Sequence, residues 1–369
     1  MMRVLFIARY RHRTMSRKVE LLAAQPDVTI CHICPRYWHD ELVQVQQATT
    51  QTTYRQIAVD IHRPADPHRA LYRTVTFALR DFQPDIIHAE EEPDSLSAAQ
   101  IAVARRLFAP RAKLLLHTWQ NLERPLKWYV RAILRMTLPA SNGIMCASRE
   151  AQDLLQRYGY TKLTPLLPAL GVDTRVFTPG EMTSREQFTI AFVGRLVPEK
   201  GLDTLIDAVG LLTRSSAPLP VKLLIIGDGP YRSDIEHYAA KLRDAVQFTA
   251  AMPPAEIAPQ LRQIDVLVLP SRTTPVWKEQ FGRVLIEAMA CGVPVVGSNS
   301  GAIPEVIGDA GLIFPEGDAN ALADCLQRLI AVPELRAELS QLGLARVQVH
   351  YTQERIAQQT LEFYRQVLA

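Results

Sequence analysis

The chain repeats one pattern along most of its length, in which a short apolar run is followed by a helical segment and then by another apolar run. Short apolar runs bounded by turn residues are typical of strands buried on both faces of a parallel sheet. Helices between such strands cover the sheet, so we predict an α/β fold. In the first half, strands are expected at 4–8, 28–33, 84–88, 113–117 and 143–147, and helices at 16–24, 70–81 and 95–107.

The pattern lapses once, at the polar stretch 178–184, and then resumes. Because a length of 369 residues suits two domains, we place one at 1–180 and another at 187–350, followed by an amphipathic helix at about 352–369. Two doubly wound domains form a cleft between the carboxyl edges of their sheets, where ligands bind. In the second half, strands are expected at 188–193, 221–226, 245–249, 266–270, 295–298 and 311–314, and helices at 201–212, 231–241 and 254–263.

Composition narrows the classes of function. Charged residues make up 21% of the chain and the net charge is only +3, which does not call for a nucleic-acid partner. Five cysteines are an odd count and argue against a disulfide framework. Cys31 and Cys34 are either a redox or metal pair or part of a buried strand, and the apolar run 28–30 before them favours the strand. We expect no metal, because two further ligands at suitable spacing are not evident.

The N-terminal run 3–8 is too short for the apolar segment of a secretory signal, and the sequence has no run of about 18 apolar residues. We therefore expect a cytoplasmic protein. The segment 124–135 is basic, amphipathic and contains aromatic residues. It either lies on the inner face of an anionic membrane and brings a lipid-linked acceptor near, or packs on the core and leaves its arginines solvated.

The most informative stretch is 279–296. Its periodicity predicts a helix over 283–290, which Gly292 ends. Glu279 precedes this helix and Glu287 lies inside it, on the order of 12 Å away, which roughly spans a nucleotide-sugar from hexose to ribose. Carboxylates suit vicinal hydroxyls, and the helix N-terminus suits a diphosphate. The alternative is a surface helix with two solvated acids, but the apolar neighbours of Glu287 argue for a partnered acid.

Two loops that follow expected strands are further candidates. In the loop 194–201, Arg195 and Lys200 could both contact a diphosphate, and the glycines at its two ends allow tight turns. This loop is neither GxGxxG nor a P-loop, and the alternative is an ordinary basic turn. The loop 227–230, with sequence Gly-Asp-Gly-Pro, is either a ligand loop or a plain strand-to-helix turn.

Together these residues resemble glycosyltransferase family 4, the large retaining family with the GT-B fold of two Rossmann-like domains. Glu279 and Glu287 match its E-x7-E pair, and the loop 194–201 matches its phosphate loop. The resemblance covers nearly all of the second half and is thinner in the first. There His117, which ends an expected strand, matches the active-site histidine of the family. The final helix resembles the one that crosses back to pack on the first domain.

The resemblance implies a retaining hexosyltransferase that works without a metal. It would move a hexose from a nucleoside-diphosphate sugar, bound by the second domain, to a hydroxyl of a glycan or lipid-linked acceptor, bound by the first, in cell-surface polysaccharide or glycolipid biosynthesis. His117 would approach the donor sugar from the opposite domain. The catalytic residues would be His117, Arg195, Lys200 and Glu279, and the donor-binding residues would be Gly194, Gly227, Gly229, Phe281, Gly282, Arg283, Val284 and Glu287.

Two positions depart from the family pattern. The loop 9–18 after the first strand contains no glycine, so either its basic side chains replace the usual backbone contacts or they are solvated. Leu170 stands where the family usually has asparagine. Two other functions remain open on the same fold: a nucleotide-sugar epimerase or hydrolase, and a non-catalytic nucleotide-sugar-binding subunit, which the loss of glycine would favour.

Overall fold

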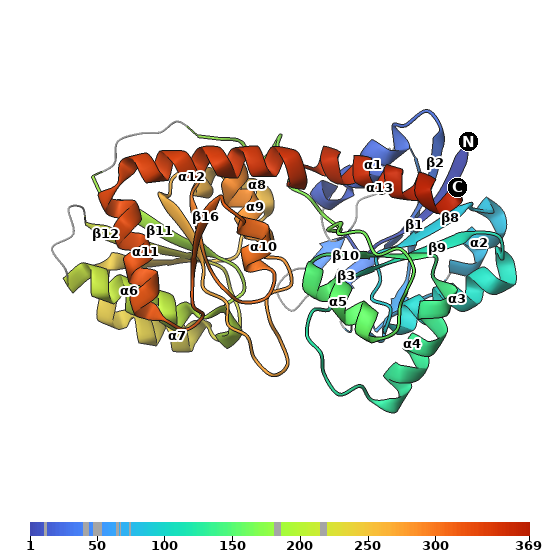
Figure 1. Cartoon of the computed structure of the whole chain (residues 1–369), viewed down its shortest axis with the longest axis horizontal. Helices are drawn as coiled ribbons and strands as arrows, with labels where there is room; N and C mark the ends of the chain where they lie inside the picture. The colour runs from blue at the N-terminus through green and yellow to red at the C-terminus, as the bar shows by residue number, and fades with distance from the viewer. Residues whose placement is uncertain are drawn as a thin grey trace. The chain divides into compact units, whose positions relative to one another are not determined.

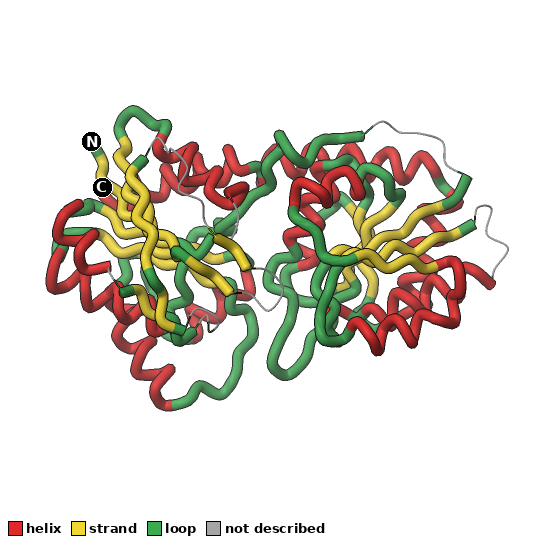
Figure 2. The backbone as a smooth tube through the Cα atoms, turned by 180° about the vertical axis from the view of Figure 1, so that it is seen from behind, coloured by secondary structure: helices red, strands yellow, loops and turns green. Residues whose placement is uncertain are grey.

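The computed structural model describes residues 1–10, 13–39, 44–46, 54–63, 66, 68–73, 75–180, 186–214 and 220–369. The chain forms two compact units (Figures 1 and 2). The first consists of residues 1–171 together with 353–369, and the second of residues 172–352. Each unit is an α/β fold with a parallel sheet inside a layer of helices, as the sequence predicts.

Among its described residues, the first unit has a six-stranded sheet in the order β10-β9-β8-β1-β2-β5. Every pairing in this sheet is parallel. Because successive side chains of a strand point to opposite faces, Leu5 and Ile7 enter one core and Val4 and Phe6 the other. The strands are β1 (Met2–Ile7), β2 (Val28–Pro35), β5 (Arg55–Val59), β8 (Ile86–Ala89), β9 (Lys113–Thr118) and β10 (Gly143–Cys146).

Helices cover both faces of this sheet. The last helix, α13 (Gln353–Leu368), packs beside α1 (Arg17–Ala23), so the end of the chain returns to the first unit as expected (Figure 1). The predicted helix 70–81 begins later, because Leu71 and Tyr72 pair with Ile61 and His62 in a short antiparallel ladder. The remaining elements are η1 (Arg13–Ser16), α2 (Val75–Phe82), α3 (Leu96–Phe108), α4 (Trp128–Ala140), α5 (Arg149–Arg157) and the short strands β3 (Tyr37–His39), β4 (Gln44–Gln46), β6 (Ile61–His62) and β7 (Leu71–Tyr72).

The second unit repeats the same topology. Its described sheet has the order β13-β12-β11-β14-β15-β16 and is parallel throughout. Its strands are β11 (Phe188–Val193), β12 (Val221–Ile226), β13 (Val246–Thr249), β14 (Val266–Leu269), β15 (Val295–Ser298) and β16 (Gly311–Phe314). Its helices are η2 (Pro198–Lys200), α6 (Leu202–Arg214), α7 (Arg232–Ala239), η3 (Ala240–Ala245), α8 (Pro254–Leu261), α9 (Arg283–Ala290), α10 (Ile303–Ile307), α11 (Ala319–Ala331), α12 (Pro333–Arg346) and the π-turn η4 (Val347–Tyr351).

Both sheets reverse their winding direction beside their first strand. The reversal lies between β1 and β8 in the first unit and between β11 and β14 in the second. In doubly wound sheets, ligands bind in the crevice outside the carboxyl ends of the strands at this switch point. The loops that follow these four strands are therefore where a site is expected in each unit.

The boundary between the units differs from the predicted one. The first unit ends at Gly171, not at residue 180. Val172 and Phe177 are buried in the core of the second unit, and the Val172 amide donates to the Tyr351 carbonyl oxygen at 2.8 Å. The segment that follows Gly171 therefore belongs to the second unit by packing. Of the expected linker, residues 181–185 lie outside the described residues.

Candidate functional site

The loops after β11 and β14 meet at the switch point of the second unit. Gly201 closes the first loop with a φ of 66°, and a Cβ atom at this position would stand 2.0 Å from the Pro270 carbonyl oxygen. Glycine is therefore required for the two loops to approach this closely. The approach brings the Lys200 Nζ to 2.5 Å from the Glu279 Oε2. Two candidate residues from separate sequence motifs thus form one ion pair.

Glu279 is held from two sides. Its carboxylate accepts a hydrogen bond from the Ser271 hydroxyl at 2.9 Å in addition to the Lys200 contact. Its carbonyl oxygen accepts from the Ala302 amide at 3.0 Å, in the loop that follows β15. Only 7% of Glu279 is exposed, which excludes a freely solvated acid. The carboxylate therefore has a fixed position just before α9.

Glu287 lies inside α9 and is also buried. Its partner is Arg283, one turn earlier, whose Nε is 2.9 Å from the Glu287 Oε1. Burial raises the pKa of the Glu287 carboxyl, and Arg283 opposes that shift. The expectation that an acid among apolar helical neighbours needs a partner is confirmed.

The N-terminus of α9 lies between these two glutamates in the sequence, as predicted. Gly282 has a φ of 77° and provides no side-chain cap for the helix. A Cβ at this position would stand 2.8 Å from the Leu269 side chain, so the helix starts directly against the end of β14. Phe281 and Val284 are half-buried on either side. The uncapped amides of this first turn and the helix dipole favour an anion.

Gly227 and Gly229 bring the loop after β12 onto the loop after β11. A Cβ at Gly227 would stand 1.8 Å from the Gly194 carbonyl oxygen, and one at Gly229 would stand 2.3 Å from that of Leu196. The Leu196 amide donates to the Asp228 carbonyl oxygen at 2.9 Å. These glycines therefore fix the shape of the loop 194–201. Their direct contact with a donor stays a prediction.

The two cations of the loop 194–201 differ in their surroundings. The Lys200 Nζ is paired with Glu279 and lies 4.9 Å from the centre of the Trp277 ring. Arg195 is exposed and forms no ion pair with any other described residue. The structure thus offers one cation already fixed at the site and one whose guanidinium remains available for an anionic ligand.

Two basic side chains of the loop 9–18, at the switch point of the first unit, are not solvated. Lys18 is 1% exposed and is paired with Glu90, and the Arg9 Nη2 lies 2.6 Å from the Glu91 Oε2. The hydroxyl of Tyr10 donates to Glu90 at 2.7 Å. Arg9 and Lys18 are therefore held by ion pairs to the acids that follow β8. Arg11 and His12 of this loop lie outside the described residues.

His117 is fully buried near the end of β9. Its Nε2 lies 3.0 Å from the Leu167 carbonyl oxygen, which assigns the proton to Nε2, and its ring lies 4.1 Å from that of Trp119. The Nδ1 is buried without a partner among the described residues. Burial, with a further contribution from Lys18, lowers the pKa of His117 to about 3. The ring is therefore neutral and presents one unused acceptor nitrogen.

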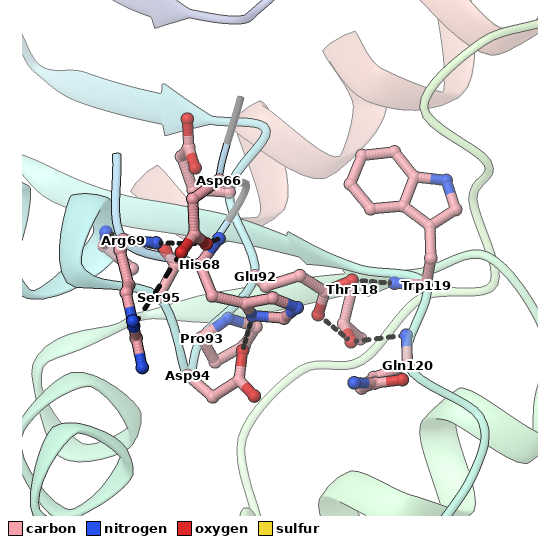
Figure 3. A network of polar contacts seen from close by, with 12 residues as sticks. Asp66, His68, Arg69, Glu92, Pro93, Asp94, Ser95, Thr118, Trp119 and Gln120 are labelled. Carbon is pink, nitrogen blue, oxygen red and sulfur yellow. Dashed lines mark hydrogen bonds and ion pairs between the residues drawn. The ribbon is translucent and has the colours of Figure 1, made fainter. Parts of the chain in front are cut away.

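Sequence reasoning missed Glu92, a half-buried acid that follows β8. Its carboxylate accepts from the Thr118 hydroxyl and the Trp119 amide, both at 2.7 Å (Figure 3). Burial, reinforced by Asp94, raises the pKa of Glu92 to about 7. The run of three glutamates after a buried strand was the available signal.

The helix α4 contains residues 128–135 of the basic segment 124–135, and its buried residues show how this segment packs. Ile133, Leu134 and Leu138 are buried, which confirms that one face of the helix packs on the core. The opposite face leaves Trp128 81% exposed, together with Arg131 and Arg135. Contact of this face with a membrane stays a prediction. No helix among the described residues is long and apolar enough to cross a membrane.

Cys31 and Cys34 are buried in β2, as the strand interpretation predicts. Burial raises the pKa of the Cys31 thiol to about 11, which disfavours the reactive thiolate. Among the described residues, no three His, Cys, Asp or Glu side chains are grouped so as to hold a metal ion.

Comparisons with known proteins point to one family. The model of "Glycosyltransferase Family 4" matches residues 17–164 and that of "Glycosyl transferases group 1" matches residues 187–332. A D-inositol 3-phosphate glycosyltransferase of Saccharomonospora viridis is 30% identical over 239 residues, which cover 60% of this chain and 54% of that protein. A GDP-mannose-dependent monoacylated alpha-(1-6)-phosphatidylinositol monomannoside mannosyltransferase of Corynebacterium glutamicum is 33% identical over 198 residues, 50% of this chain and 51% of that one. The chain thus spans about half the length of these relatives.

Solved structures share the fold over the whole chain. HepE of Anabaena in complex with UDP has a TM-score of 0.74 at 18% identity and covers 99% of this chain and 100% of its own. Sucrose-phosphate synthase of Thermosynechococcus elongatus has a TM-score of 0.71 at 21% identity and covers 100% and 99%. At these identities the similarity shows the fold alone, with two Rossmann-like units.

Proposed function

The chain belongs to glycosyltransferase family 4, and from this premise we propose that it moves a hexose from a nucleoside-diphosphate sugar to a hydroxyl of a glycan or lipid-linked acceptor. The observation that carries the proposal is the group formed by Lys200, Glu279 and the start of α9 at the switch point of the second unit. The names of the mannosyltransferase relative and of the HepE complex specify GDP-mannose and UDP, which supports this class of donor. We further propose a role in cell-surface polysaccharide or glycolipid biosynthesis.

The donor is proposed to lie along the start of α9. The fixed carboxylate of Glu279 accepts hydrogen bonds from hexose hydroxyls, and that of Glu287 from the ribose. Between them, the uncapped amides of α9 receive the diphosphate. The two acids hold the donor and do not form an acid/base pair, because each is already engaged with a cation.

The chemistry is assigned to the departing diphosphate. As the bond to the sugar breaks, positive charge develops on the sugar ring and negative charge on the leaving group. Lys200, Arg195 and the dipole of α9 stabilise that negative charge. We expect retention of configuration by attack from the same face, with the leaving phosphate taking the proton of the acceptor. His117 is proposed to act near the sugar as a neutral ring, because burial lowers its pKa to about 3.

The test is nucleoside diphosphate release from UDP-, GDP- and ADP-sugars by the purified chain, with and without acceptor alcohols. We expect release that depends on an acceptor and yields a product of retained configuration. Release without an acceptor would indicate a hydrolase, and conversion of the sugar itself would indicate an epimerase. Donor binding without any turnover would instead indicate a non-catalytic nucleotide-sugar-binding subunit.

A further inference from the structure

A cavity of about 660 Å³ opens in the first unit. Its walls come from the segment that follows β6, from the residues after β8, and from the loop that leads from β9 into α4. It therefore lies beside the carboxyl ends of β8 and β9, where doubly wound sheets bind ligands. We call it the α4 pocket, and it is lined by Arg63, Asp66, His68, Arg69, Asp94, Leu96, Arg124, Pro125, Leu126, Lys127, Tyr129, Val130 and Ile133.

Positive charge predominates in the α4 pocket. Four side chains with permanent positive charge face two carboxylates, an excess of two positive charges before His68 is counted. The hydrogen bond to Asp94 raises the pKa of the His68 imidazole above its ordinary value, which favours the charged form of the ring. The cations are Arg63, Arg69, Arg124 and Lys127, and the carboxylates are Asp66 and Asp94.

The two carboxylates are engaged mainly by other groups of the pocket. The Asp66 Oδ1 accepts from the backbone amides of His68 and Arg69, both at 3.0 Å, and the Asp94 Oδ1 lies 3.2 Å from the His68 Nδ1 (Figure 3). The arginines are farther away, with Arg69 at 3.7 Å from Asp66 and Arg124 at 3.8 Å from Asp94. Their guanidinium groups therefore retain donors for a ligand.

The first turn of α4 adds to the positive potential. Its N-cap residue, Lys127, makes no side-chain cap bond, and the same turn contributes Tyr129 and Val130 to the wall of the pocket. The Tyr129 hydroxyl lies 3.5 Å from the Arg69 Nη2. That contact, together with the charge of Lys127, lowers the pKa of the Tyr129 phenol. An uncapped helix start, a phenol and several cations thus converge on one space.

We propose that the α4 pocket binds the phosphate group of a phosphorylated acceptor. This inference rests on the proposed glycosyl transfer and specifies its acceptor class. Arginine forks suit phosphate oxygens, and the half-buried Leu126 and Val130 offer an apolar wall for the carbon skeleton that carries the phosphate. The phosphate belongs either to a soluble sugar or polyol phosphate or to a phospholipid headgroup.

Calorimetric titration of the full chain with glucose 6-phosphate, and with glucose as the uncharged control, tests the proposal. We expect binding of glucose 6-phosphate only, and a loss of affinity of about tenfold or more in the double variant Arg69→Gln/Arg124→Gln. The matched control is Arg106→Gln, an exposed arginine at the end of α3 outside the pocket. In the second arm, the chain is sedimented with vesicles of phosphatidylglycerol in phosphatidylcholine. If the wild type co-sediments with these vesicles and the double variant does not, the phosphate is assigned to a lipid.

Two further variants guard against misleading results. Asp94→Asn removes a competing carboxylate and is expected to tighten phosphate binding several-fold, a gain that misfolding does not produce. Lys200→Ala, at the candidate donor site, is expected to leave phosphate binding unchanged. The proposal is overturned if neither probe binds, if the double variant binds as the wild type does, or if the affinity is lost in Lys200→Ala instead. If a nucleotide-sugar still stabilises the double variant, its donor site is intact. A failure of the phosphate proposal is then distinguished from a failure of the proposed glycosyl transfer.

Discussion

Gly301 lies so close to Glu279 that a Cβ atom at position 301 would stand 2.0 Å from the Glu279 carbonyl oxygen. The φ of Gly301 is 54°, and the amide of the next residue donates to the same carbonyl oxygen at 3.0 Å. The loop after β15 thus sets the position of the carboxylate that pairs with Lys200. A residue with no functional group of its own fixes the geometry of the candidate donor site.

Gly301→Ala is expected to lower turnover by roughly 10- to 100-fold, because displacing Glu279 by about an ångström misaligns the donor. Gly159→Ala is the matched control. Gly159 has a φ of 82°, but its added Cβ would meet no atom within 4 Å. That variant carries the backbone strain without the collision, so its turnover should equal that of the wild type. Equal turnover in the two variants would refute the positioning role of Gly301.

Lys200→Ala is expected to lower turnover by on the order of 10²-fold, which corresponds to about 3 kcal/mol of stabilisation of the leaving group. Lys241→Ala serves as the control, because the Lys241 Nζ also lies 2.5 Å from a carboxylate, that of Asp207, but at an exposed position. Loss of that surface pair should change the free energy of unfolding by less than about 1 kcal/mol and leave turnover intact. Undiminished turnover in Lys200→Ala would remove Lys200 from the mechanism.

Glu92→Gln is expected to change how stability depends on pH. The pKa of Glu92 is raised from 4.5 to about 7 in the folded chain, so the native state binds its proton more tightly than the unfolded chain does. The contribution of this proton to the free energy of unfolding is complete below pH 4.5 and is lost as the pH rises through about 7. The free energy of unfolding of the variant relative to wild type should therefore be higher at pH 8 than at pH 5, by roughly 2–3 kcal/mol. Urea unfolding at both pH values measures this difference, and an equal difference at both would contradict the assignment.

Transfer is expected to continue in excess EDTA. Lys200, Arg195 and the start of α9 supply the positive charge that a divalent cation would otherwise bring to the diphosphate. The measurement is the initial rate after dialysis against chelator, compared with the rate after Mg²⁺ or Mn²⁺ is added back. Loss of activity that either metal restores would show that the protein's own cations are insufficient.

The six strands of the second unit were predicted well because their signals are local, whereas no helix was predicted over α11 or α12. The helix of 283–290 was defined by its apolar period and by Gly292 after it, and the structure places α9 at Arg283–Ala290. The strand β5 was missed, since Arg55 and Gln56 give this edge strand no continuous apolar run. Edge strands face solvent more than central ones, so their composition resembles that of loops.

The remaining features depend on contacts between residues far apart in the chain. Lys18 and Glu90 are separated by 72 positions, and nothing near Lys18 in the sequence indicates a buried ion pair. The α4 pocket joins segments from residue 63 to residue 133. The structural demand for glycine at positions 227 and 229 comes from a neighbouring loop and not from the turn itself. Such relationships appear only when the tertiary structure is in view.

The central claim is that Glu279, Glu287 and the start of α9 hold a nucleotide-sugar. Thermal unfolding of the wild type and of Glu287→Gln, each with millimolar UDP-, GDP- and ADP-sugars, tests it most directly. At a donor concentration of 100 times its dissociation constant, binding should add about 2.7 kcal/mol to the stability of the wild type, and that gain should be reduced in Glu287→Gln. If no nucleotide-sugar stabilises the wild type, or if the variant is stabilised to the same extent, the assignment of this site is wrong.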